Sequence, residues 1–163
     1  VLVEAMALVG RLALLVAVLL DGSKAVKKLN DDTFEHQTQA STGMTTGSWL
    51  VTFGSKACGE PCTAMTEALD DANEDLRAMY VLPARVEQED SKGLWKRFAI
   101  KEVPTTLLFA KHKLYRFSGE ATSAALVDFS QKALDQQFKG DEIPGEPSFL
   151  EKLMEKVKQL LGG

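Results

Sequence analysis

Residues 49–63 read Trp-Leu-Val-Thr-Phe-Gly-Ser-Lys-Ala-Cys-Gly-Glu-Pro-Cys-Thr, and they hold both cysteines of the chain, Cys58 and Cys62. The first five residues form a short apolar run, of the type found in a strand buried on both faces. A helical pattern follows the cysteines, so the two thiols are expected at a strand-to-helix turn. Because the N-terminus of a helix carries partial positive charge, this position stabilises a thiolate and makes the pair a candidate redox couple.

The composition is that of a globular protein with one domain. The chain has 163 residues, of which 45% are hydrophobic and 26% charged, which is enough for one hydrophobic core. The net charge of −4, with no basic stripe interleaved with aromatic residues, argues against nucleic acid as a partner. Two cysteines are too few for a disulfide scaffold, so the fold must depend on its core.

The N-terminal segment is more apolar than the rest. Residues 12–20 are uninterrupted apolar residues after Arg11, followed by small residues at Ser23 and Ala25. As a helix this run is about 14 Å long, well short of the ~30 Å hydrocarbon core of a bilayer. Residues 1–25 therefore predict a secretory signal peptide, with a retained membrane anchor or a buried helix as alternatives. The expected location is the secretory pathway, in the endoplasmic reticulum lumen, secreted, or anchored to a membrane through this segment.

Strand and helix patterns alternate along the remaining chain. The expected strands are residues 25–29, 49–53, 80–86, 105–110 and 113–117, and the expected helices are residues 33–40, 61–79, 91–98 and 122–138. Pro83 is a mild objection to a central position for the strand that contains it. The order predicts an α/β fold in which helices flank a central mixed β-sheet.

The C-terminal part predicts a linker and a separate helix. Residues 140–147 are rich in Gly, Pro and acidic residues, and residues 148–163 form an amphipathic pattern that begins at Ser148. Glu151 completes a capping box with Ser148. This helix either packs its apolar side against the domain, which we expect, or docks on a partner or a membrane surface.

Over residues 26–139 the chain resembles the thioredoxin superfamily, and within it a domain of protein disulfide isomerase. The resemblance rests on residues 48–53, on the cysteine turn with Gly59 and Pro61, and on the sequence Phe-Ala-Ile-Lys-Glu-Val-Pro-Thr-Thr-Leu-Leu-Phe at residues 98–109. It implies a thioredoxin-like fold. It also implies that Pro104 is the family's cis-proline, packed against the cysteines, and that the backbone at Val103 holds a substrate strand.

Three departures from the family pattern bear on function. Three residues separate the cysteines where the family has two, Ala57 replaces a tryptophan, and Thr52 occupies the position of the family's buried carboxylate. That carboxylate helps to move the proton of the second thiol. We therefore expect an enzyme slower than a full isomerase, since general acid–base help contributes roughly 10²–10⁴-fold.

The residues around the cysteines define their expected roles. Residues four apart on a helix have Cα atoms roughly 6 Å apart, which permits a disulfide. Cys58, before the helix, is the predicted nucleophile, and Cys62, one turn deeper, resolves the mixed disulfide. Lys56 favours the thiolate and Glu60 opposes it, while Pro61 is tolerated in the first helical turn and stiffens it.

Two functions follow as hypotheses. The first is a thiol–disulfide oxidoreductase of the disulfide isomerase type, acting on thiols or disulfides of client polypeptides. The second is a redox-inactive binding or structural subunit in which Cys58 and Cys62 form a structural disulfide. A metal site would need a histidine near the cysteines, and in this fold His36 and His112 lie elsewhere, so we expect neither a metal nor another cofactor.

Overall fold

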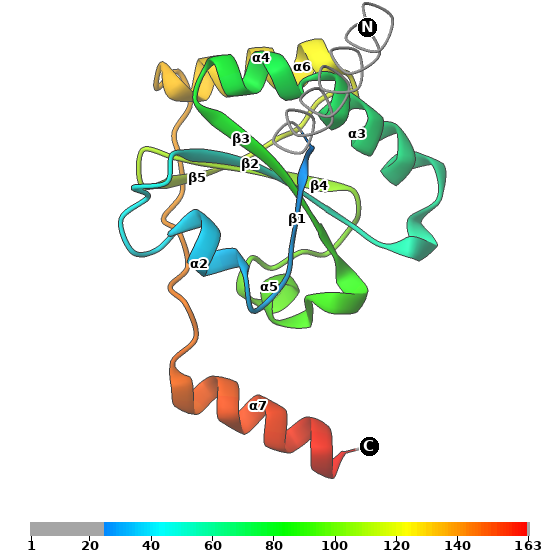
Figure 1. Cartoon of the computed structure of the whole chain (residues 1–163), viewed down its shortest axis with the longest axis vertical. Helices are drawn as coiled ribbons and strands as arrows, with labels where there is room; N and C mark the ends of the chain where they lie inside the picture. Colours follow the sequence, from blue (N-terminus) through cyan, green and yellow to red (C-terminus); the bar gives the residue numbers. More distant parts are fainter. Residues whose placement is uncertain (1–24, 163) are drawn as a thin grey trace, which may run out of the picture.

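The structure is a computed structural model that describes residues 25–162, and it contains the expected α/β sheet (Figure 1). Five strands pair in the order β1-β3-β2-β4-β5. Their bounds are β1 Lys27–Leu29, β2 Ser48–Gly54, β3 Val81–Glu87, β4 Thr105–Ala110 and β5 Lys113–Arg116. Strands β1, β3 and β2 are parallel, whereas β4 and β5 are antiparallel to their neighbours. The predicted thioredoxin-like fold with a mixed central sheet is confirmed.

Strand β2 lies in the middle of the sheet and is buried on both faces, as its apolar run predicts. Leu50 packs into the core on one face, whereas Trp49, Val51 and Phe53 pack into the core on the other. This alternation follows from the two-residue period of a strand. The centre of the sheet is therefore rigid, and it holds the turn that follows β2 in a defined place.

Helices cover both faces of the sheet (Figure 1). Helices α3 (Glu60–Asp71), α4 (Asn73–Ala78) and α6 (Ser123–Leu134) contribute to the core on one face. Helices α2 (Phe34–Thr38) and α5 (Lys92–Arg97) contribute to the core on the other. The helix predicted over residues 61–79 is divided in two at Ala72, a turn residue between α3 and α4 whose backbone angles (φ −77°, ψ −10°) stay in the right-handed helical region.

The structure tests two predictions about the sheet, one on Pro83 and one on the β4–β5 turn. Pro83 lies within β3 even though this strand has neighbours on both sides, and β1 pairs only with residues 84–86, just past the proline. The β4–β5 hairpin turns at Lys111 and His112 as predicted, with φ of 53° and 59°. Two consecutive positive φ angles are typical of the tight turns that join antiparallel strands.

The chain after α6 is attached to the domain and then leaves it. Asp141 pairs with Leu114 beside β5, Ile143 packs against the core, and the carbonyl oxygen of Pro144 accepts a hydrogen bond of 3.0 Å from Arg97. Helix α7 (Phe149–Leu161) follows, below α5 in Figure 1. It begins at Ser148 with the predicted capping box to Glu151.

The expectation that α7 packs its apolar side against the domain is wrong. All residues of α7 are described, and none of them is buried. The physical reason is that both faces of the sheet are already covered by other helices. No helix within residues 25–162 is long and apolar enough to cross a bilayer. The predicted signal peptide or anchor falls on residues 1–24, which lie outside the described part of the chain.

Candidate active site

The two cysteines lie where β2 gives way to α3. A short 3-10 helix, η1 (Lys56–Cys58), follows β2, and α3 begins at Glu60 after Gly59. Cys58 therefore precedes α3, and Cys62 lies in its first turn. This is the strand-to-helix turn that the sequence predicts, with Cys58 on the side of the unpaired backbone N–H groups at the helix start.

Cys58 and Cys62 form a disulfide, across a sequence separation of 4. Their Cα atoms are 5.7 Å apart, within the range of ordinary disulfides. Both cysteines are half-buried, so solvent and a client sulfur can reach the bond. A Cβ atom built on Gly54 would lie 3.5 Å from the Sγ of Cys62. The last residue of β2 thus borders the second sulfur.

The residues between the cysteines fix the path of the turn. Gly59 has φ 71° and ψ −142°, and a Cβ atom there would meet no atom within 4 Å. Glycine is therefore needed for its backbone conformation, which other residues rarely adopt. Pro61 lies in the first turn of α3, where its missing N–H leaves no intrahelical hydrogen bond unmade.

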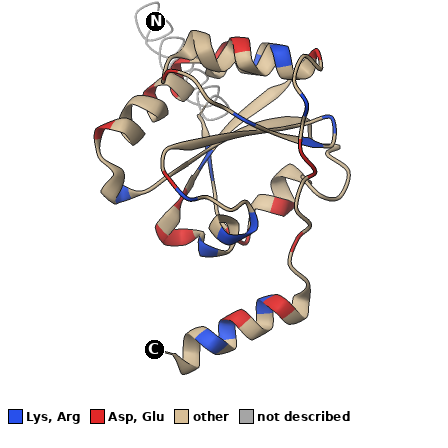
Figure 2. Cartoon of the chain, turned by 180° about the vertical axis from the view of Figure 1, so that it is seen from behind, with Lys and Arg blue, Asp and Glu red and all other residues tan. Residues whose placement is uncertain are grey.

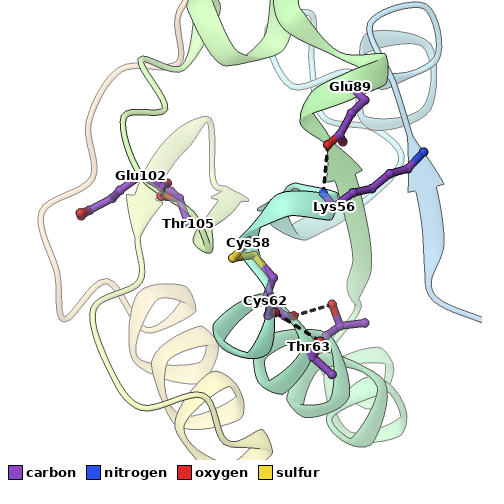
Figure 3. The surroundings of a disulfide bond; sticks show 9 residues. Lys56, Cys58, Cys62, Thr63, Glu89, Glu102 and Thr105 are labelled. Atoms are coloured by element: carbon purple, nitrogen blue, oxygen red, sulfur yellow. Dashed lines mark hydrogen bonds between the residues drawn. A yellow bond between two sulfur atoms is a disulfide. The ribbon is translucent and has the colours of Figure 1, made fainter.

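The loop before β4 lies at the same edge of the sheet as the disulfide. Thr105, the first residue of β4, pairs with Phe53 near the end of β2. The Val103–Pro104 bond just before it is cis, the isomer that the resemblance implies, and both residues are half-buried. Figure 3 shows Glu102 and Thr105 on the side of the disulfide opposite Glu89. The hydroxyl of Thr105 donates a hydrogen bond of 2.7 Å to the carbonyl oxygen of Glu102, which closes the loop.

Thr52 forms a buried polar pair instead of presenting a carboxylate. Its hydroxyl lies 2.9 Å from the hydroxyl of Thr106, its partner in the β2–β4 register. Thr52 is two residues before Gly54, so both lie on the same face of β2, the face that borders Cys62. The pair satisfies both hydroxyl groups and offers the sulfurs no ionisable side chain. Thr106 is a site residue that sequence reasoning missed, although the two adjacent threonines at 105 and 106 are a signal.

Charged groups frame the turn on one side. The backbone N–H of Lys56 donates a hydrogen bond of 3.0 Å to the carboxylate of Glu89, which lies in the short helix η2 (Gln88–Asp90) after β3 (Figure 3). The side chain of Lys56 extends away from the sulfurs (Figure 3). The start of α3, directly after Cys58 in the chain, is a fixed source of positive potential for it. Glu60 is exposed at the start of α3, and sequence reasoning did not identify Glu89.

An open hollow of about 540 Å³ adjoins this side of the turn. Its lining residues are Gln88, Glu89, Lys92, Trp95, Lys96 and Ile100. Glu89 belongs both to this hollow and to the hydrogen bond with Lys56. The wall of the hollow therefore presents an indole ring and charges of both signs next to the cysteine turn.

The histidines lie away from the sulfurs. His112 is in the turn of the β4–β5 hairpin, at the end of β4 opposite Thr105, and His36 is in α2. Within residues 25–162, no group of three or more histidine, cysteine, aspartate or glutamate side chains is placed to hold a metal ion.

Comparisons with known proteins agree with this geometry. The family model described as Thioredoxin matches residues 25–132. The chain is 41% identical over 103 residues to a thioredoxin domain-containing protein of Theileria parva, a match that covers 63% of this chain and 46% of that protein. The chain thus spans about half the length of this curated relative.

Solved structures share the fold at low sequence identity. The J-Trx1 fragment of ERdj5 superposes with a TM-score of 0.56 at 15% identity, covering 67% of this chain and 50% of the fragment. The zinc-bound form of human ERp44 gives a TM-score of 0.57 at 17% identity, covering 66% of this chain and 32% of that one. Because the family model covers well over half of the sequence, the chain belongs to the thioredoxin family.

Proposed function

We propose that this protein is a thiol–disulfide oxidoreductase of the protein disulfide isomerase type, acting on client polypeptides. The observation that carries the proposal is the half-buried Cys58–Cys62 disulfide at the start of α3, at the same sheet edge as the loop of Pro104. A disulfide with only a structural role needs no access from solvent, whereas a redox couple does.

The reaction proceeds by two thiol–disulfide exchanges. In the reducing direction, the thiolate of Cys58 attacks one sulfur of a client disulfide, and the client's other sulfur leaves as a thiolate that takes up a proton. The thiolate of Cys62 then attacks the Sγ of Cys58 and restores the intrachain disulfide. The second client sulfur leaves as a thiol. Run in reverse, the same steps move two electrons from a client dithiol to the Cys58–Cys62 bond.

The residues around the disulfide favour the thiolate of Cys58 but provide no base for Cys62. The turn of Gly59 and Pro61 holds Cys58 before the helix start, which favours its thiolate. The backbone at Val103 would hold an extended client segment, as the family resemblance implies. Thr52 supplies no base to Cys62, so the proton of the Cys62 thiol passes to water or to the client. The expected rate is therefore lower than that of an enzyme with a carboxylate there, by a factor within the usual 10²–10⁴ range of general acid–base catalysis.

The proposed location is the secretory pathway. The support is the pattern of residues 11–25, a basic residue, a short apolar run and a small-residue site. The oxidising lumen of that pathway would also keep the Cys58–Cys62 pair oxidised between encounters with clients.

Reduction of insulin by the full-length protein tests the activity. With dithiothreitol as the electron donor, we expect the wild type to accelerate insulin precipitation, and Cys58→Ser to lose this acceleration. Cys62→Ser should instead accumulate a mixed disulfide with the client, visible by mass spectrometry under non-reducing conditions. Equal rates for the wild type and Cys58→Ser would refute the proposal.

A redox-inactive binding or structural subunit is the second candidate. The buried Thr52–Thr106 pair favours it, because the group that usually serves the second thiol is missing. In that case Cys58 and Cys62 stay bonded in mild reductant, and replacing both by serine leaves client binding unchanged. The reduction potential of the pair, measured against glutathione buffers, separates the two candidates. A value in the range of isomerases, near −180 mV, favours the enzyme.

A further inference from the structure

Helix α7 carries a continuous apolar stripe that no part of the described chain covers. The stripe comprises Phe149, Leu150, Leu153, Met154, Val157, Leu160 and Leu161. At 3.6 residues per turn these residues fill roughly 140° of the helix circumference. Even Val157, near the middle of the stripe, is 41% exposed. A stripe of this width needs a partner to remove it from water.

The polar side of α7, not the stripe, is turned toward the domain. Glu155 lies 3.7 Å from the ammonium group of Lys96 on α5, and around the helix Glu155 is nearly opposite Val157. The pKa of Glu151 is lowered by the N–H of Ser148 foremost, then by the hydroxyl of Ser148, and also by the charge of Lys96. Both acidic residues of α7 are therefore near Lys96, and the stripe points away from the domain.

The charges that stay unpaired on α7 are positive and border the stripe. The acids are engaged, Glu151 in the capping box and Glu155 with Lys96, while Lys152 bonds to Glu146 in the linker. Within the part of the chain that the structure describes, Lys156 and Lys158 have no ion-pair partner. On the helix circumference Lys156 lies next to Phe149 and Lys158 next to Met154, one on each side of the stripe. Figure 2 shows this mixture of charges along α7.

We infer that α7 binds the surface of a bilayer that contains anionic phospholipids. The stripe would enter the boundary between headgroups and acyl chains, and Lys156 and Lys158 would lie at the level of the phosphates, their aliphatic stems on the apolar surface. Because the polar side faces the domain, the domain would stay in water above the membrane. This inference does not depend on the redox function of Cys58 and Cys62.

The same charges argue against a second copy of the chain as the partner that covers the stripe. When two such helices pair through their stripes, the residues that flank each stripe approach those of the other helix. Here the flanking residues without partners are lysines, so the approach would bring like charges together. Thirteen residues, the length of α7, also give a helix pair less than two full heptads of contact.

Vesicle sedimentation with the full-length protein tests the inference. The probes are vesicles of phosphatidylcholine alone and of phosphatidylcholine with phosphatidylserine in a three-to-one ratio. Because residues 1–24 are the same in every variant, differences between variants report on α7. We expect the wild type to bind the mixed vesicles, and Leu153→Ser with Val157→Ser to weaken this binding at least about tenfold. Residues of α7 are exposed, so this variant keeps the fold of the domain.

Variants that remove positive charge from α7 measure the electrostatic contribution to vesicle binding. Lys156→Gln with Lys158→Gln should weaken binding to the mixed vesicles by about fivefold per lysine, with little change for phosphatidylcholine alone. The matched control is Lys111→Gln with Lys139→Gln, which removes the same charge from exposed positions outside α7 and should bind as the wild type does. Equal vesicle binding by the wild type and the Leu153/Val157 variant would overturn the inference. So would a dimer in analytical ultracentrifugation that this variant abolishes.

Discussion

Thr52 occupies the position where the family resemblance places a buried carboxylate. Its hydroxyl bonds to that of Thr106 in a buried position at 2.9 Å. Neither hydroxyl ionises in the ordinary pH range, so this part of the core is neutral whenever the protein is folded. The stability of the fold gains from such a pair, because a buried carboxylate would have to lose its hydration. In the proposed reaction, Cys62 therefore has no base at Thr52 to accept its proton.

Two substitutions at Thr52 separate structure from catalysis. Thr52→Val leaves the hydroxyl of Thr106 without its partner, so we expect the free energy of unfolding to fall by about 1–2 kcal/mol, with the rate of insulin reduction unchanged. Thr52→Asp places a carboxylate on the face of β2 that borders Cys62, and we expect the rate to rise about tenfold or more above neutral pH.

Urea denaturation and the insulin assay, run on both variants, check these expectations. Thr52→Val is the matched control, since it changes the same site without adding a base. A rate for Thr52→Asp no higher than that of the wild type, in a folded protein, would contradict the role assigned to this position.

At the scale of single elements, local sequence signals predicted those structures that local interactions decide. The apolar run at residues 49–53 became a strand buried on both faces, and Ser148 with Glu151 formed its capping box. The division of the 61–79 helix at Ala72 was missed, because its apolar face continues through the break and buries Leu69, Ala72 and Leu76 alike. The apolar period shows which face is buried, and it does not show where one helix ends and the next begins.

The placement of site residues from different elements was harder to predict. The Val103–Pro104 bond is cis and directly precedes β4, whereas the packing of Pro104 against the cysteines stays a prediction. The approach of Glu89 to the backbone of Lys56 joins residues 33 positions apart, and no local pattern announces such a contact. The contact of Glu155 on α7 with Lys96 on α5 likewise joins two helices that are far apart in the sequence.

The capping box of α7 makes a quantitative prediction at this scale. Ser148→Ala removes the hydroxyl that accepts the N–H of Glu151 at 3.3 Å. Helix N-caps of this kind contribute about 1 kcal/mol, so we expect the amide protons of α7 to exchange about fivefold faster. Hydrogen exchange followed by mass spectrometry measures this. Ser118→Ala, at an exposed serine outside the helices, should leave exchange in α7 unchanged, and an equal effect of both substitutions would disprove the role of the cap.

At the scale of the whole molecule, Arg97 and Glu35 connect α5 to α2 and its following loop. The guanidinium group lies 2.9 Å from the carboxylate, and their side chains are only 4% and 11% exposed. Arg97 also lies over the rings of Phe34 and Phe98, at 5.7 and 4.9 Å from their centroids. Burial alone would raise the pKa of Glu35, but hydrogen bonds from the N–H and hydroxyl of Ser41 and from Arg97 lower it overall.

This lowered pKa makes the stability of the fold depend on pH. The folded state holds the Glu35 carboxylate in its charged form more strongly than the unfolded state does, so its contribution is present above the ordinary value of 4.5. It is lost as the pH falls through the lower pKa of the folded state. We expect Glu35→Gln to lower the free energy of unfolding by about 1–2 kcal/mol at neutral pH, and the difference from the wild type to shrink as the pH falls below 4.5.

Denaturant titrations at a series of pH values measure this difference. Glu67→Gln is the matched control at an exposed position on α3, and its difference from the wild type should stay near zero throughout. A Glu35→Gln difference that is constant with pH would show that the carboxylate charge contributes nothing.

Arg97 also limits the distance between α7 and the domain. Within residues 25–162, its hydrogen bond to Pro144 is the last attachment of the linker to the domain before the helix cap at Ser148. The five peptide steps from Pro144 to Phe149 span at most about 18 Å. A bilayer that binds α7 would therefore hold the Cys58–Cys62 disulfide within a short distance of its surface, because the linker leaves the domain little freedom to move away.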